Sequence, residues 1–188
     1  MGCKINLSKR PLIPRAETEF WVEKVLPACR QAGATRKIKV LDIFAGSGCI
    51  GLVIEKNIKN AQVFFADKYQ YFEHKNFIKS DVFSNIKDKF DYIFANPPYV
   101  AKNKIKQVQR SVLKYEPHSA LFAGKDGLFY IKKFLKQAKE HLNPGGKIFM
   151  EFSPEQKNAI GELLKSFDYK AWEFNKDQFD RFRWVVIT

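Results

Sequence analysis

Four residues that follow an apolar run, Asn96-Pro97-Pro98-Tyr99, could hold a planar amino group. Two prolines in series fix φ and lack N–H donors, which leaves carbonyl oxygens of this corner free to accept hydrogen bonds. The Asn96 side chain supplies another acceptor, and the Tyr99 ring supplies a flat surface. The corner therefore predicts a site where an NH₂ group donates both its hydrogens while its face rests on an aromatic ring.

A second segment, DIFAGSG at residues 42–48, predicts a ligand-binding turn between a strand and a helix. Glycine lets the backbone approach a ligand closely, and open α/β sheets bind ligands at the carboxyl ends of their strands. Asp67 ends the next apolar run, where a carboxylate can accept hydrogen bonds from both hydroxyls of a ribose. Alone, each feature is equally typical of a packing turn or a helix cap. Together they favour an adenosine-bearing cofactor, and the lack of a following Gly-Lys-Ser/Thr disfavours a phosphate-binding loop.

Alternating strand and helix patterns must position these residues. Apolar runs predict strands over 38–45, 61–67, 91–95 and 147–152, and helical spacing predicts helices over 17–30, 49–56, 127–142 and 154–167. The Asn-Pro-Gly-Gly segment at 143–146 should end the third helix, and residues 170–174 and 181–188 read as a terminal antiparallel pair. This order predicts an α/β fold around a mainly parallel sheet.

The connection after the second predicted strand is short, because only thirteen residues separate Asp67 from Asp81. A parallel crossover with a helix usually needs a dozen or more residues before the next strand starts. If a strand occupies 76–81, residues 68–75 must make the whole crossover. We therefore expect one helical turn or none here, and a more open cofactor pocket.

Composition limits the class of protein. The chain has 188 residues with 45% hydrophobic residues, which excludes a disordered chain, and no apolar stretch approaches the ~20 residues of a membrane span. Three cysteines and three histidines, widely spaced, indicate neither a disulfide framework nor a metal centre. We expect a cytoplasmic, monomeric protein without a metal, with an N-terminal segment and helix over 1–36 and a cofactor-binding domain over 37–188.

The charge leaves two interpretations open. Thirty-three basic residues against twenty acidic ones give a net charge of +13, which favours a nucleic-acid partner because bound phosphates release counterions. The bases, however, are spread along the chain and are mostly lysine. A solvated lysine surface therefore fits the composition as well as a functional basic face.

Together the glycine turn, the strand-end acid and the NPPY corner resemble those of S-adenosylmethionine-dependent amino methyltransferases. Further segments are similar to the peptide-chain release factor glutamine N5-methyltransferases, and the resemblance covers nearly the whole chain. These segments are LIPRAETE (12–19), YEPHSAL (115–121) with GKDGL (124–128), NPGGKIFME (143–151) and the final strand (181–187).

This resemblance implies a Rossmann-like class I methyltransferase fold, a seven-stranded type of sheet that is mainly parallel and ends in an antiparallel hairpin. It implies methyl transfer from S-adenosylmethionine to a glutamine side-chain amide, in the Gly-Gly-Gln loop of release factors. The implied cofactor residues are Asp42, Phe44, Ala45, Gly46, Ser47, Gly48, Asp67, Asp81, Val82 and Asn96, with Asp81 and Val82 beside the adenine. The implied substrate residues are Asn96, Pro97, Pro98, Tyr99, Arg15, Glu17 and Thr18, of which Asn96, Pro97 and Tyr99 are catalytic.

Three features depart from the family pattern. Phe44 stands where the family usually has glycine, and the FAGSG turn is more typical of ribosomal-RNA guanine methyltransferases. The chain opens just before the LIPR segment, so we expect the helical domain that the family uses to engage release factors to be missing. The short crossover is the third departure. Two other functions stay open: N-methylation of an exocyclic amine of adenine or guanine in RNA or DNA, and a non-catalytic cofactor-binding or interaction module.

Overall fold

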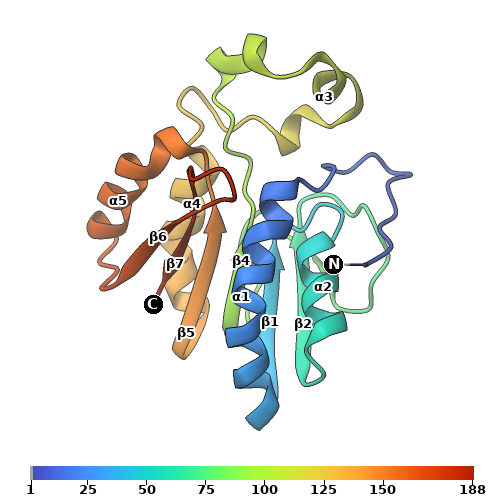
Figure 1. Cartoon of the computed structure of the whole chain (residues 1–188), viewed down its shortest axis with the longest axis vertical. Coiled ribbons are helices and arrows are strands. Elements are labelled where there is room, and N and C mark those ends of the chain that lie inside the picture. The colour runs from blue at the N-terminus through green and yellow to red at the C-terminus, as the bar shows by residue number, and fades with distance from the viewer. Residues whose placement is uncertain (1) are drawn as a thin grey trace.

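Seven strands form one mixed sheet in the order β3-β2-β1-β4-β5-β7-β6 in a computed structural model that describes residues 2–188, the Ser119 side chain excepted (Figure 1). Strand β1 is parallel to β2 and β4, β2 is parallel to β3, and β4 is parallel to β5. Strand β7 runs antiparallel to both β5 and β6. The expected parallel sheet and its terminal antiparallel pair are thus confirmed. The strands are β1 (Ile38–Ile43), β2 (Ala61–Asp67), β3 (Phe77–Lys79), β4 (Phe90–Ala95), β5 (Leu142–Glu151), β6 (Trp172–Lys176) and β7 (Phe182–Ile187).

Five α-helices and four short 3₁₀ helices connect the strands within the described residues. The α-helices are α1 (Ala16–Thr35), α2 (Cys49–Asn57), α3 (Arg110–Tyr115), α4 (Phe129–Ala138) and α5 (Lys157–Ser166). The 3₁₀ helices are η1 (Lys102–Gln107), η2 (His118–Ala120), η3 (Lys139–His141) and η4 (Pro154–Gln156). None of the described helices has the length and apolar character to cross a membrane.

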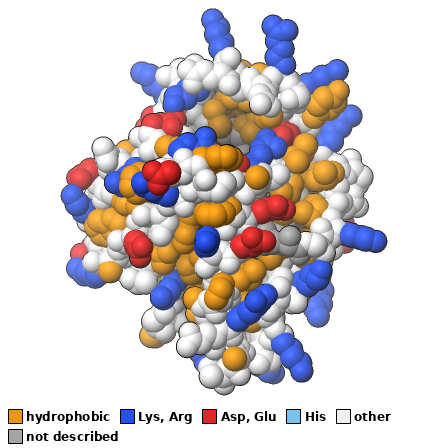
Figure 2. Space-filling view, in the orientation of Figure 1, with side chains coloured by type: hydrophobic (Ala, Val, Ile, Leu, Met, Phe, Trp, Pro, Cys, Tyr) orange, Lys and Arg blue, Asp and Glu red, His pale blue; other side chains and the backbone are white. Residues whose placement is uncertain are grey.

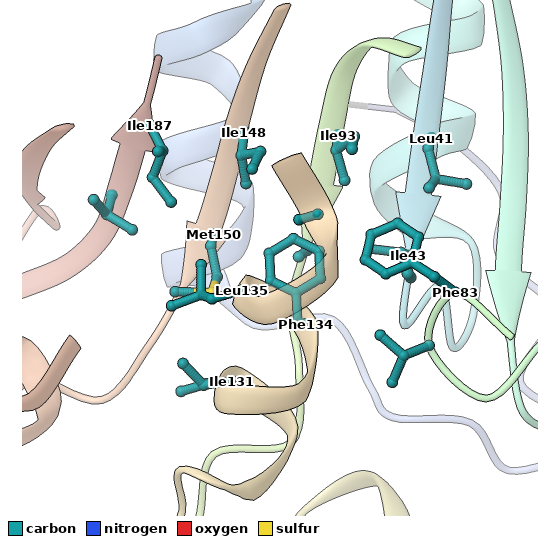
Figure 3. Packing of buried hydrophobic residues seen from close by; sticks show 14 of the residues in the cluster. Leu41, Ile43, Phe83, Ile93, Ile131, Phe134, Leu135, Ile148, Met150 and Ile187 are labelled. Carbon is teal, nitrogen blue, oxygen red and sulfur yellow. The ribbon is translucent and has the colours of Figure 1, made fainter. Parts of the chain in front are cut away.

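Each face of the sheet buries one apolar cluster. Helices α1 and α2 cover one face, where Trp21, Val25 and Ile54 pack on strand residues such as Val40 and Phe65. Helices α4 and α5 cover the other face. Figure 3 shows α4 residues of this second cluster against the sheet; its labelled residues include Ile131, Phe134 and Leu135 of α4 and Leu41, Ile43, Ile93, Ile148, Met150 and Ile187 of the strands. Strand β1 is buried over five of its six residues, as a central parallel strand requires.

The crossover between β2 and β3 contains no helix, which confirms the expectation from its length. Residues 68–76 connect β2 to β3 as a loop. The Asn76 Nδ2 donates to the Val63 carbonyl at 2.9 Å and holds this loop against β2. Strand β3 is only three residues long. The pocket above it is therefore bordered by a loop where a crossover helix would otherwise stand.

The predicted helix stop at 143–146 is wrong in detail. Helix α4 ends at Ala138, and the Asn-Pro-Gly-Gly segment belongs to strand β5. Leu142 pairs with Phe90 and Lys147 with Tyr92, so four residues bulge opposite one. The Asn143 side chain donates to Asp91 Oδ1 at 3.2 Å and holds this bulge. Helix α1 is also longer than expected and continues past an internal Pro27 to Thr35.

The residues between β4 and α4 project above the carboxyl ends of the strands (Figure 1). We call residues 102–120, which contain η1, α3 and η2, the cap. Between Asp91 and Asp126 the only acidic residue is Glu116. Figure 2 shows Lys and Arg side chains projecting from this upper end of the molecule. The cap is therefore a basic surface beside the carboxyl edge of the sheet.

Candidate active site

A pocket lies at the carboxyl ends of β1, β2 and β4. Strand β1 pairs with β2 on one side and β4 on the other, so the chain leaves the sheet in opposite directions here, which is where open α/β sheets bind ligands. The pocket holds about 890 Å³ of empty space, open solvent at its mouth included. Its lining includes eleven predicted residues: Arg15, Thr18, Phe44, Ala45, Gly46, Ser47, Asp67, Asp81, Val82, Asn96 and Pro98.

The turn after β1 has a left-handed backbone at three residues. Phe44, Gly46 and Gly48 have φ of 60°, 53° and 76°. A Cβ on Gly48 would lie 2.6 Å from the Phe72 ring, so no larger side chain fits. The Phe72 ring contacts Phe65 of β2 edge-on, at 5.1 Å between centroids. The turn is thus compressed between the sheet and the short crossover, which brings its backbone to the pocket wall.

Asp67 holds this turn against the next strand. Its Oδ2 accepts from the Gly46 N–H at 2.9 Å, and its Oδ1 accepts from the Tyr69 N–H at 3.0 Å. Burial raises the pKa of Asp67, and these backbone donors partly offset that effect. Each carboxylate oxygen has a second lone pair, so both can still accept from the hydroxyls of a ribose. The residue therefore fits the adenosine-bearing cofactor that the sequence predicts.

Asp42 does not line the pocket, contrary to its predicted contact with the cofactor. Its side chain turns under α2, where Oδ2 accepts from the Gly51 N–H at 2.8 Å, and it is 1% exposed. Burial raises its pKa to about 8. Asp42 thus holds the start of α2 in place. Gly48 also lies outside the lining, because Phe72 covers it.

Two residues of the NPPY corner line the pocket and two do not. Asn96 and Pro98 line the pocket, whereas Pro97 is buried and Tyr99 lies behind the wall. The Tyr99 hydroxyl donates to Glu151 Oε1 at 3.0 Å, and burial together with this carboxylate raises the tyrosine pKa above its ordinary range. The flat face expected of Tyr99 is thus not part of the pocket lining. Direct substrate contacts of Pro97 and Tyr99 stay predictions.

Asn96 is held by one hydrogen bond. Its Nδ2 donates to Thr18 Oγ1 at 3.3 Å, and Thr18 in turn donates to Glu151 Oε2 at 2.7 Å. The Asn96 Oδ1 accepts no hydrogen bond from any described residue, and it is not a buried atom. Since Asn96 lines the pocket, this oxygen is available to a donor on a ligand there.

The far end of the NPPY corner is fixed by Gly127, which precedes α4, and by Gln156 of η4. A Cβ on Gly127, which has φ of 75°, would lie 2.2 Å from the Tyr99 carbonyl oxygen, so only glycine fits. The Gln156 side chain donates to the same carbonyl at 3.0 Å. Val100 next forms a bridge with Phe122, which joins the corner to the base of the cap. Gly127 of the DGL motif and Gln156 therefore support the corner from outside the pocket.

Arg15 and Glu17, which we predicted to line the pocket wall, lie in different places. Arg15 lines the pocket, and its guanidinium donates to Glu116 Oε1 in the cap at 2.6 Å. Glu17 lies outside the lining, because its carboxylate pairs with Arg181 on the outer surface at 3.1 Å. Glu17 thus does not line the pocket wall, contrary to the prediction.

The opposite wall carries Asp81 and Val82. Asp81 Oδ1 accepts from Lys133 of α4 at 2.8 Å. Val82 is 3% exposed and has φ of 56°, a left-handed conformation that is rare for a β-branched residue. Sequence reasoning missed several lining residues, among them Leu12, Pro14, Tyr69, Tyr71 and Tyr130. One sequence feature could have identified Tyr69 and Tyr71, because a crossover without a helix must place its own side chains at the pocket.

The residues present fit an adenosine-bearing cofactor. The pocket combines a compressed glycine turn, a strand-end carboxylate with free lone pairs, and an apolar wall that includes Ile43 and Val82. Within residues 2–188, no three metal-binding side chains cluster.

Comparison with known proteins extends this assignment. A family model described as Eco57I restriction-modification methylase matches residues 20–180. A release factor glutamine methyltransferase of Flavobacterium psychrophilum is 31% identical over 202 residues, covering 100% of this chain and 71% of that protein. One from Streptococcus pneumoniae is 36% identical, covering 99% of this chain and 70% of that protein. The chain belongs to the release factor glutamine methyltransferase family.

Solved structures agree on the fold of this release factor glutamine methyltransferase family member. The release-factor-specific protein-(glutamine-N5) methyltransferase of Alicyclobacillus acidocaldarius aligns with a TM-score of 0.60 and 19% identity, over 93% of each chain. The hMettl16 catalytic domain, in complex with MAT2A 3'UTR hairpin 6, aligns with a TM-score of 0.67 and 15% identity, over 97% of this chain and 74% of that one. The expected class I methyltransferase fold is confirmed.

Proposed function

We propose that this protein transfers a methyl group from S-adenosylmethionine to the side-chain amide nitrogen of a glutamine in a peptide-chain release factor, in its Gly-Gly-Gln loop. Curated relatives of 31% and 36% identity carry this activity in their names. The observation that carries the proposal is Asn96. Its Nδ2 is held by Thr18, and its Oδ1 is open to the pocket beside the glycine turn.

The chemical difficulty lies in the amide nitrogen, whose lone pair is delocalised into its carbonyl. When bound, S-adenosylmethionine supplies an electrophilic methyl group on a sulfonium. Asn96 Oδ1 accepts one N–H of the glutamine, and the Pro97 carbonyl is the predicted acceptor for the other. Two acceptors in the plane of the NH₂ group favour a lone pair directed out of that plane. They also stabilise the positive charge that develops on nitrogen as the new bond forms.

Positioning supplies much of the remaining rate. The corner is rigid because its prolines fix φ and because Gly127, Gln156 and Glu151 hold Tyr99 from three sides. Thr18 and Pro98 complete the wall next to Asn96. No general base is needed here, since an amide nitrogen that carries positive charge loses its proton to water readily.

The test is methylation of a purified release factor with labelled S-adenosylmethionine, followed by peptide mass analysis. We expect a gain of one methyl group on the glutamine of the Gly-Gly-Gln loop. Asn96→Ala should lower kcat by about 10²-fold or more and change cofactor affinity by only a few-fold, because an acceptor for the developing charge is lost. Equal losses in kcat and cofactor affinity would assign Asn96 to the cofactor site instead.

A second candidate is N-methylation of an exocyclic amine in RNA or DNA. The match to the Eco57I restriction-modification methylase family model and the basic cap favour it. Lys102, Lys106, Arg110 and Lys114 are exposed on the cap. The same labelling experiment with bulk RNA and DNA distinguishes the two, because label in nucleic acid alone would exclude the release factor as substrate.

Partners beyond the substrate stay predictions. The cap is where we expect contact with nucleic acid, and such contact should weaken steeply with salt as phosphate counterions compete. We likewise propose a monomeric protein, a division into residues 1–36 and 37–188, and a cytoplasmic location.

A further inference from the structure

Beneath the NPPY corner lies a buried polar network that the proposed reaction does not use directly. We propose that Thr18 and Glu151 are positioning residues that fix which end of the Asn96 carboxamide faces the substrate. The inference rests on the proposed function only in that the acceptor substrate presents an NH₂ group.

Glu151 is the centre of this network. It ends strand β5 and is 1% exposed. Three donors reach its carboxylate: Trp21 Nε1 at 2.8 Å and Thr18 Oγ1 at 2.7 Å on Oε2, and Tyr99 Oη at 3.0 Å on Oε1. A buried carboxylate is tolerated only when donors of this kind surround it. The network therefore demands that each of these groups donate to Glu151.

That demand sets the direction of the next hydrogen bond. The Thr18 hydroxyl has one hydrogen, and it is given to Glu151. Only lone pairs then remain on Thr18 Oγ1, so its second neighbour must be a donor. Asn96 meets this condition by presenting Nδ2 at 3.3 Å. With the amide reversed, Asn96 Oδ1 and Thr18 Oγ1 would face each other as two acceptors.

This hydrogen-bond direction determines which end of the Asn96 carboxamide faces the pocket. The two ends of a carboxamide have nearly the same shape, so packing alone would hold either orientation equally well. With Nδ2 fixed on Thr18, Oδ1 is the end left for the substrate. The reversed amide would instead aim an NH₂ group at the substrate NH₂, which removes an acceptor and opposes two donors. The network thus selects the orientation that can accept.

Helix α1 supplies two of the three donors. Thr18 and Trp21 are three residues apart on this helix, so both lie on one face above Glu151. This placement gives the ETE motif of the N-terminal segment a role that the sequence alone did not reveal. A structural role for Glu151, anchoring α1 to β5, would use the same contacts but would not involve the Asn96 amide.

A double-mutant cycle separates these roles, with Thr18→Val, Asn96→Ala and the two combined. Thr18→Val keeps the branched shape and removes the hydroxyl. We expect it to lower kcat by about 10-fold or more and to leave cofactor affinity within about two-fold, with Thr18→Ser restoring most of the turnover. In the Asn96→Ala background, Thr18→Val should cost less than about two-fold more, because the amide it orients is gone. Losses that multiply fully would overturn the proposal.

Two further measurements keep the result decisive. Tyr169→Phe removes a buried hydroxyl that donates to the Leu135 carbonyl at 2.8 Å on the opposite face of the sheet, so it is the control for lost stability. It should leave kcat within about two-fold of the unmodified enzyme. The side-chain amide resonances of Asn96, followed by NMR, should shift in Thr18→Val and Glu151→Gln. Unchanged resonances would overturn the proposal even if the release factor proved not to be the substrate.

Discussion

Phe44 and Val82, on the pocket wall, hold left-handed backbone conformations that suit glycine, with φ of 60° and 56°. Such conformations cost of order 1–3 kcal/mol each and persist only where the surroundings impose them. The Phe44 ring packs edge-on against Tyr130 and Phe134, at 6.0 and 6.1 Å between centroids. Side-chain packing therefore offsets backbone strain at the point where the family usually has glycine.

A pair of substitutions at Phe44 measures that strain. Phe44→Ala removes the ring but keeps a Cβ at a left-handed residue, whereas Phe44→Gly removes both. We expect the glycine variant to be more stable than the alanine variant by about 1–2 kcal/mol, the reverse of the usual order in regular structure. Urea unfolding of the two variants compares them directly. A more stable alanine variant would mean that the turn relaxes and stores no strain.

Residue-scale prediction from sequence worked best where chemistry constrains the backbone. Most of the glycine-turn residues, Asp67 and Asn96 all meet at one pocket, because strand-end motifs of a parallel sheet converge at one edge. It failed for Asp42 and Glu17, whose side chains turn to α2 and to Arg181. A sequence pattern places a residue on an element, but side-chain direction depends on partners distant in the chain.

At the scale of elements, one ion pair joins the N-terminal segment to the cap. The Glu116 side chain is 2% exposed and that of Arg15 is 33% exposed. Lys104 of the cap makes a second pair, with Glu155, in which both side chains are exposed. A buried acid that loses its partner costs several kcal/mol, whereas an exposed pair contributes about 0–1 kcal/mol. The Arg15–Glu116 pair is therefore the main electrostatic restraint we expect on the cap.

Glu116→Gln tests this restraint. Because the neutral amide pairs weakly with Arg15, we expect hydrogen exchange across residues 102–120 to rise by about 10-fold or more, while α4 exchanges as before. Lys104→Ala is the matched control and should raise exchange in the cap by less than about three-fold. Equal effects from the two variants would contradict the ranking of the two pairs.

The elements themselves were largely predictable. The apolar run over 61–67 coincides with β2, and the residue count correctly limited the crossover between β2 and β3 to one helical turn or none. The Asn-Pro-Gly-Gly segment misled, because its turn residues also suit a bulge, and only pairing with β4 decides between a helix stop and a bulged strand. Local sequence indicates that regular structure is interrupted, but it does not indicate which strand pairs with the interrupted segment.

At the scale of the whole molecule, the buried acid Asp42 makes stability depend on pH. Burial raises the pKa of Asp42 to about 8 and also raises the pKa values of Asp67 and Glu151. Asp42 therefore stays protonated in the folded state at pH values where it is ionised in the unfolded state. Through Asp42, the free energy of unfolding should fall as pH rises from about 4 toward 8, by at most about 1.4 kcal/mol per pH unit.

Asp42→Asn isolates this contribution. The amide oxygen can still accept from the Gly51 N–H, but the side chain no longer titrates. Between about pH 5 and pH 8, we expect the variant to show a shallower fall in unfolding free energy than the unmodified protein. Urea unfolding at several pH values measures both slopes. Parallel slopes would show that Asp42 is ionised in the folded protein throughout this range.

The hydrogen bond from Thr18 to Glu151 joins positions 133 residues apart. On the ribosome, the helix that carries Thr18 emerges early, whereas the strand that ends at Glu151 emerges only after most of the chain has been made. No nascent chain that lacks Glu151 can orient the Asn96 amide in this way, whatever part of the sheet has already formed. Full turnover during synthesis would thus require that Thr18 of α1 has reached Glu151 at the end of β5.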